Sequence, residues 1–109
     1  MTHALADIAA TQLAAARAAA NGRSALTVFG GHEHTLRQTV LALVAGQGLD
    51  EHESPGEATL YVLTGHVRLS AGSDAWEARA GELLPVPPRR HGLQALDDSA
   101  VLLTVAKTP

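Results

Sequence analysis

The chain has 109 residues and a formal net charge of −3, and alanine supplies much of its 46% hydrophobic content. A chain of this length builds one domain around a single modest core. It contains no cysteine, which excludes disulfides and thiolate metal sites. It also has no run of basic residues, so we expect no nucleic-acid partner. With only three aromatic residues, the core must consist mainly of Leu and Val, which suits strands.

The alanine-rich segment at residues 4–20 is predicted to be the one helix, because alanine has the highest helix propensity. Thr2 is a candidate N-cap, Asp7 suits the positive end, and Asn21-Gly22 is a stop signal. The apolar stripe is shallow, so we expect the helix to pack on the outside of the body or on a partner subunit. The segment does not resemble a signal peptide, and no stretch approaches the ~20 apolar residues of a membrane span. We therefore expect a cytoplasmic protein with no membrane contact.

The rest of the chain is typical of β-structure. Short apolar runs with turn signals every eight to twelve residues indicate a sandwich or barrel. We divide the chain into a helix at residues 1–22 and a β-body at residues 23–109. Strands are predicted at residues 25–29, 36–44, 58–63, 66–71, 75–79, 82–86, 92–96 and 101–107.

Residues 49–91 carry an ordered set of motifs. A polar loop at residues 52–57 (HESPGE) leads into a strand and turn at residues 61–65 (YVLTG). Gly81, a hydrophobic strand with three prolines, and His91 follow. This order resembles the core of the cupin family, whose two motifs are usually written G-x5-H-x-H-x(3,4)-E-x6-G and G-x5-P-x-G-x2-H-x3-N. The resemblance implies an all-β fold, a cupin-type antiparallel β-barrel (jelly roll, or double-stranded β-helix), here with one N-terminal α-helix.

The family resemblance also implies a site inside the barrel. In cupins, two histidines and one glutamate of the first motif join the histidine of the second motif around a divalent metal. His52 and His91 match two of these positions, whereas Ser54 replaces the second histidine and Ala58 stands at the glutamate position. The metal ligands that the resemblance implies are therefore His52, His91 and Glu57, holding Zn, Fe, Mn or Ni, with Glu57 turned inward by a bulge. We expect His52 and His91 to face each other, with Ser54 on the same side and able to contact a ligand.

Two further groups could contribute to binding. Arg37 and Gln38 begin a long strand, and an inward Arg37 would bind a carboxylate or phosphate with its planar fork. An outward Arg37 would simply be solvated. His32 and His34 form a second H-x-H, which either joins the site or lies in a solvated polar loop.

Three functions remain open at this stage. The first is a domain that binds or senses a small molecule inside the barrel. The second is a metal-dependent enzyme of the dioxygenase or isomerase type, for which the sequence identifies no catalytic residue, P-loop or dinucleotide fingerprint. The third is a structural or regulatory dimer whose barrel is filled by its own side chains. The absence of two metal ligands from the first motif favours the first and third of these functions over the enzyme. The family resemblance implies a homodimer.

Overall fold

The computed structural model describes residues 2–107, which form one helix and nine strands. The strands pair antiparallel throughout. The elements are α1 (Leu5–Ala18), β1 (Arg23–Phe29), β2 (Leu36–Leu43), β3 (Gly48–His52), β4 (Glu57–Thr64), β5 (His66–Ala71), β6 (Asp74–Arg79), β7 (Leu83–Val86), β8 (His91–Ala95) and β9 (Ser99–Ala106).

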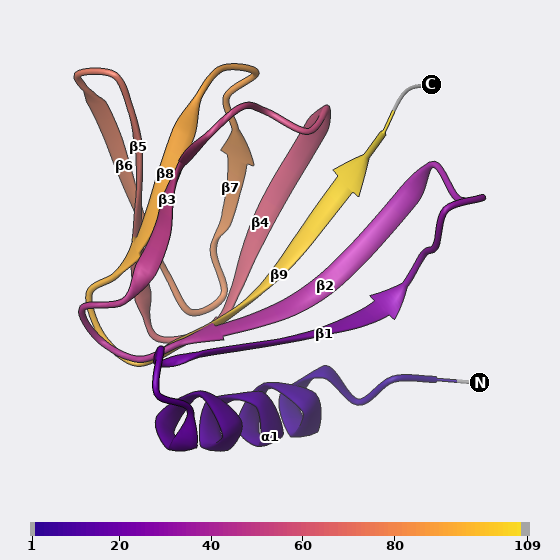
Figure 1. The fold of residues 1–109 in the computed structure, drawn as a ribbon, viewed down its shortest axis with the longest axis vertical. Helices are drawn as coiled ribbons and strands as arrows, with labels where there is room; N and C mark the ends of the chain where they lie inside the picture. The colour runs from indigo at the N-terminus through magenta and orange to yellow at the C-terminus, as the bar shows by residue number, and fades with distance from the viewer. Residues whose placement is uncertain (1, 108–109) are drawn as a thin grey trace.

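The strands form two facing sheets (Figure 1). The five-stranded sheet has the order β1-β2-β9-β4-β7, and the four-stranded sheet has the order β3-β8-β5-β6. Strands that are distant in sequence lie side by side: β9 pairs with both β2 and β4, and β8 lies between β3 and β5. Apart from the hairpins β1–β2 and β5–β6, successive strands belong to different sheets, as in a jelly roll. The predicted all-β class with one N-terminal helix is confirmed.

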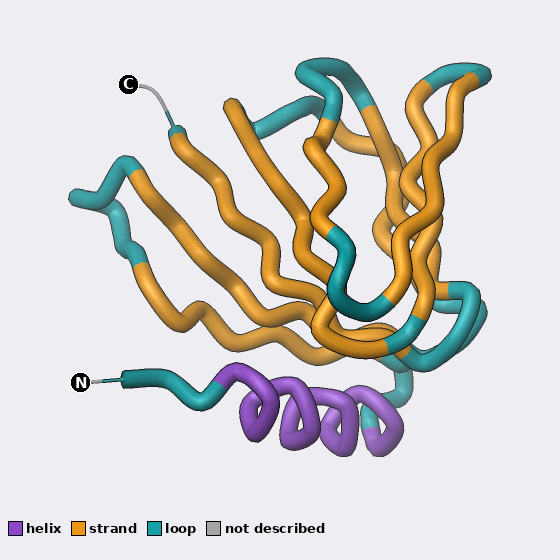
Figure 2. Tube along the Cα trace, turned by 180° about the vertical axis from the view of Figure 1, so that it is seen from behind, coloured by secondary structure: helices purple, strands orange, loops and turns teal. Residues whose placement is uncertain are grey.

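The helix α1 packs across the outer face of the five-stranded sheet (Figure 2). Its buried residues, Ala9, Leu13 and Ala16, contact Ala42 of β2 and Ala100 of β9. Small side chains on both surfaces let the helix lie close to the strands. The helix starts after Ala4, which provides no side-chain cap, so the predicted N-cap at Thr2 is wrong.

The interior between the sheets is filled by alternate residues of each strand. On β2, Leu41 and Leu43 enter this core, while Ala42 between them faces the helix. This alternation follows from the two-residue period of a strand. The core contains Leu and Val from both sheets and no aromatic side chain, as the composition predicted.

One strand was not predicted from the sequence. β3 occupies Gly48–His52, where a turn followed by a polar loop was expected. Its Asp50 and Glu51 interrupt the apolar pattern, and both are exposed. The strand forms because Gly48 and Leu49 pair with β8. In the part of the chain that the structure describes, no helix has the length and hydropathy to cross a membrane.

Candidate functional site

The two motif histidines meet at one end of the four-stranded sheet. His52 ends β3 and His91 begins β8, and they are register partners in the antiparallel ladder. Directly opposed residues in such a ladder share a face. Their ring centroids lie 4.7 Å apart with an interplanar angle of 65°, which is an edge-to-face contact. The pairing of β3 with β8 therefore brings the two imidazoles together.

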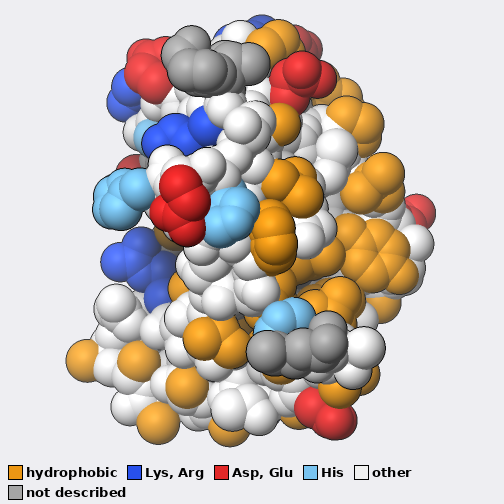
Figure 3. Space-filling view, turned by 90° about the vertical axis from the view of Figure 1, so that its right-hand side faces the viewer, with side chains coloured by type: hydrophobic (Ala, Val, Ile, Leu, Met, Phe, Trp, Pro, Cys, Tyr) orange, Lys and Arg blue, Asp and Glu red, His pale blue; other side chains and the backbone are white. Residues whose placement is uncertain are grey.

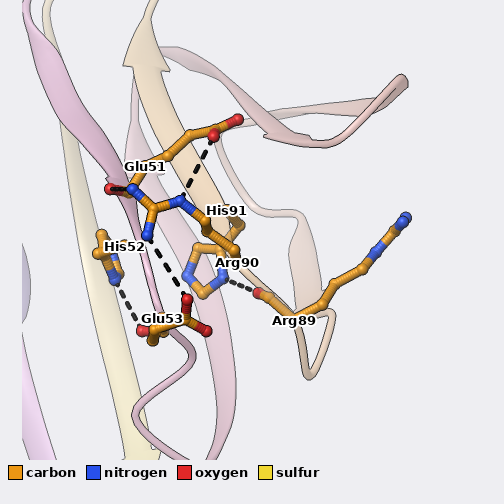
Figure 4. Close-up of polar contacts among 6 residues, drawn as sticks. All are labelled: Glu51, His52, Glu53, Arg89, Arg90 and His91. Atoms are coloured by element: carbon orange, nitrogen blue, oxygen red, sulfur yellow. Dashed lines mark hydrogen bonds and ion pairs between the residues drawn. The ribbon is translucent and has the colours of Figure 1, made fainter.

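Each imidazole is oriented by a backbone carbonyl (Figure 4). Nδ1 of His52 donates to the carbonyl oxygen of Glu53 at 3.0 Å, and Nδ1 of His91 donates to that of Arg89 at 2.7 Å. A carbonyl oxygen only accepts, so Nδ1 carries the proton in both rings. A neutral imidazole then has its lone pair on Nε2. Neither Nε2 atom has a hydrogen-bond partner within residues 2–107, so both are available to a ligand.

Arg90 connects the ends of the two strands that carry the histidines. Its Nη2 donates to the carbonyl oxygen of Glu51 at 3.0 Å, and its Nη1 lies 3.5 Å from Oε1 of Glu53 (Figure 4). These groups are largely exposed, so the ion pair adds at most about 1 kcal/mol. Its structural effect is more specific, because Glu53 also accepts the hydrogen bond from His52. Arg90 thus contacts the side chain of the residue whose backbone carbonyl orients one of the rings.

Both rings line a small cavity between the sheets. The volume of the cavity is ≈ 40 Å³. His91 is buried, with 6% of its surface exposed, whereas His52 is exposed and lies where the cavity reaches the surface. A water needs roughly 10–15 Å³ by this measure, so the cavity holds about three water-sized groups. The remaining lining is wholly apolar: Leu41, Leu49, Pro55, Ala58, Leu60, Leu69, Val86, Leu93 and Leu103.

Ser54 and Glu57 do not join the histidine pair. β3 ends at His52, so the alternation of a strand does not extend to Ser54, whose hydroxyl donates to the carbonyl oxygen of Gly56 at 2.9 Å. Glu57 is exposed, and Ala58 lines the cavity instead. The bulge needed to turn Glu57 inward is absent from β4 at this point, where the register with β9 is regular.

The donor set at the cavity is smaller than a protein metal site needs. Within residues 2–107, no three His, Asp or Glu side chains gather in a group that could hold a metal ion. Zinc sites in proteins use at least three protein ligands. His52 and His91 supply two, so these residues do not fit the resident metal that the family resemblance implies. Metal binding by this pair stays a prediction.

Arg37 and Gln38 point to opposite faces of β2. Arg37 follows the alternation of Leu41 and lies on the inner face, beside its register partner Val105. Gln38 lies on the outer face, where its side-chain amide donates to Oγ1 of Thr104 at 3.2 Å. Of these two candidates, only Arg37 faces the same side of the sheet as the cavity.

The second H-x-H lies in the loop between β1 and β2. The ring of His34 contacts the ring of Phe29, with centroids 5.0 Å apart, and its Nδ1 lies 3.2 Å from Oε1 of Glu33. His32 lines a surface groove together with Arg37. Neither histidine lines the cavity of His52 and His91.

Two facing antiparallel sheets with this strand order form a jelly-roll fold, and the paired imidazoles lie at one end of the space between the sheets. No protein-family model matches the chain, and no curated protein matches it. Solved structures do. The chain is similar to a conserved protein of unknown function from Streptococcus pyogenes (25% identity, 84% of this chain and 79% of that one, TM-score 0.74). It is also similar to an RmlC-like cupin protein from Desulfovibrio desulfuricans (27% identity, covering 77% of this chain and 81% of that one, TM-score 0.66). A cupin superfamily protein from Desulfitobacterium hafniense shares the fold at 13% identity (covering 79% of this chain and 78% of that one, TM-score 0.71).

The chain has the fold of a small RmlC-like cupin domain. This conclusion agrees with the motif resemblance at residues 49–91.

Proposed function

We propose that this cupin domain binds a small molecule at the end of the barrel marked by His52 and His91. The observation that supports the proposal is the state of the two imidazoles. Each has Nδ1 engaged by a backbone carbonyl and Nε2 without a partner, and both rings line one apolar cavity. Such a pair accepts hydrogen bonds from a hydroxyl or amide group, while the cavity receives an apolar group.

The size of the cavity limits the ligand. Pockets for drug-sized ligands have volumes of about 300–1,000 Å³. A cavity of ≈ 40 Å³ admits only a short apolar group of about three non-hydrogen atoms. The ligand is therefore either very small, or it inserts its tip while the remainder lies outside at the surface around His52.

The test is a binding screen followed by NMR. Short alcohols, amides and carboxylates of three to five carbons serve as probes, and the histidine ring signals and backbone amide signals are followed during titration. We expect His52→Ala and His91→Ala each to weaken binding at least tenfold. The matched control is His34→Ala, because that imidazole lies outside the cavity. Unchanged affinity in both cavity variants would contradict the proposal.

A filled, purely structural barrel is the second candidate, and the small cavity volume favours it. Nine apolar side chains line the small cavity together with the two imidazoles. If this candidate is correct, no probe shifts the signals of cavity residues even at tens of millimolar. The same screen includes a titration with zinc. Zinc binding that is lost in both His52→Ala and His91→Ala would support the predicted metal site, although it has only two protein ligands.

A further inference from the structure

A groove on the inner face of the β1–β2 hairpin gathers polar groups that the histidine cavity does not use. It has a volume of ≈ 300 Å³ and is lined by Thr27, Gly30, Gly31, His32, Arg37 and Thr39. None of these lining residues is acidic. Figure 3 views the molecule from the end at which this hairpin loop lies, where histidine and acidic side chains gather next to a hydrophobic area.

Arg37 is the charged group of this groove, and it has no partner within residues 2–107. Its Nε atom is buried and forms no hydrogen bond. By contrast, Arg17 and Arg89 are about half exposed, and each pairs with a carboxylate. A partly buried guanidinium without a counter-charge is costly, because desolvation is not repaid by an ion pair. An anion bound beside Arg37 would remove this cost.

The backbone of Gly30 lies against the stem of Arg37. A Cβ built on Gly30 would lie 3.0 Å from both Cα and Cγ of Arg37, so no side chain fits between them. Gly30 has φ +115°, a conformation that L side chains rarely adopt. The hairpin therefore brings its backbone against the Arg37 stem. An arginine fixed in this way loses less side-chain entropy on binding than a free one.

Two hydroxyl groups stand on the same face as Arg37. Thr27 and Thr39 are register partners in β1 and β2, and their Oγ1 atoms lie 3.4 Å apart. A hydroxyl can donate to an anion, and guanidinium groups bind carboxylate and phosphate oxygens through paired hydrogen bonds. The acidic side chain of the loop, Glu33, is 76% exposed, lies against His34 and borders the groove at Gly31. This set of donors suits an oxyanion.

The groove and the histidine cavity are neighbours on one sheet face. Thr39 of the groove is the register partner of Leu103, which lines the cavity. Adjacent strands are only about 4.8 Å apart. One small ligand can therefore contact both places, with its charged group in the groove and its apolar tip in the cavity.

We propose that Arg37, with Thr27 and Thr39, binds the carboxylate or phosphate group of the ligand whose apolar end enters the His52–His91 cavity. This inference rests on the proposed function. It defines the ligand class as a small amphipathic anion.

The experiment compares four probes by NMR titration: butyrate, butyl phosphate, n-butanol and inorganic phosphate. We expect butyrate or butyl phosphate to bind at least tenfold more tightly than butanol, and to shift the amide signals of both Thr39 and Leu93. Arg37→Gln should reduce the affinity for the anion to that of butanol and leave butanol binding unchanged. Arg68→Gln, an exposed strand arginine on β5, is the matched control and should change neither affinity. The better of the two anions identifies carboxylate or phosphate.

The outcomes separate the two proposals. If butanol binds in the cavity and Arg37→Gln leaves anion binding unchanged, the anion site is overturned while the proposed function stands. If inorganic phosphate shifts Thr27 and Thr39 in an Arg37-dependent way and no probe reaches the cavity, the proposed function is overturned, and so is the amphipathic ligand. If no probe shifts either region, both are overturned. Arg37→Lys, which keeps the charge but loses the planar fork, should retain intermediate anion affinity, and it replaces Arg37→Gln if that variant does not fold.

Discussion

Leu69→Ala tests whether the barrel interior is packed as tightly as the structure indicates. Leu69 of β5 is 1% exposed, belongs to the core and lines the histidine cavity. The substitution removes about three carbon groups, which costs ~2.4 kcal/mol in lost burial. If about 35 Å³ of the new space stays open, the cavity term adds ~0.8 kcal/mol. We therefore expect the free energy of unfolding to fall by about 3 kcal/mol, a large part of the ~5–15 kcal/mol of a typical domain.

The measurement is urea denaturation followed by circular dichroism, with thermal melting as a second readout. A loss of about 3 kcal/mol corresponds to a drop in Tm of roughly 10–20 °C for a domain of this size. Leu83→Ala is the matched control, because Leu83 is also a strand leucine but is 59% exposed. It should cost less than about 0.5 kcal/mol. A Leu69→Ala variant that loses under about 1 kcal/mol would refute the packing described for this cavity.

Three further predictions concern the acid response, a turn and the oligomeric state. The pKa of Asp98 is lowered mainly by the hydrogen bond from the backbone N–H of Ala45 and then by Arg17. The stabilising contribution of the Asp98 carboxylate is therefore present above its unfolded pKa of about 4 and is lost as pH falls through the lower folded pKa. Asp98→Asn should flatten the acid limb of a melting-temperature profile between pH 7 and 2. Gly65 and Gly46 both have positive φ, but a Cβ at Gly65 would collide with Ser99, whereas a Cβ at Gly46 would meet no other atom. Gly46→Ala should lower the free energy of unfolding by about 1–2 kcal/mol in chemical denaturation, and Gly65→Ala should lower it clearly more. Equal losses of stability in the two variants would contradict the contact with Ser99. The chain should sediment as a homodimer at tens of micromolar and weaken as a dimer when its N-terminal helix is deleted, and a monomer mass for the intact chain would count against this.

Short-range pattern in the sequence determined the type and order of most elements. The alanine run predicted α1, although the helix ends at Ala18, with Ala19 as its C-cap, before the predicted Asn-Gly stop. Gly22 takes the expected left-handed conformation at φ 67°, but in the turn after the helix and not at C′. The apolar runs between turn signals predicted all the strands except β3. The order of motif residues identified the cupin fold and singled out His52 and His91. These features could be predicted because propensity, periodicity and turn chemistry act over a few residues.

Only the tertiary structure decided the composition of the site. β3 exists because its backbone pairs with β8, and a polar sequence gives no sign of such pairing. The inward position of Arg37 follows from its register with β9, and the position of Thr27 in the same groove follows from pairing across a hairpin. Ser54 lies apart from His52 because the strand ends between them. Cross-strand register and the volume left by packed side chains depend on residues far apart in the chain. They therefore cannot be predicted from the periodicity of a single strand.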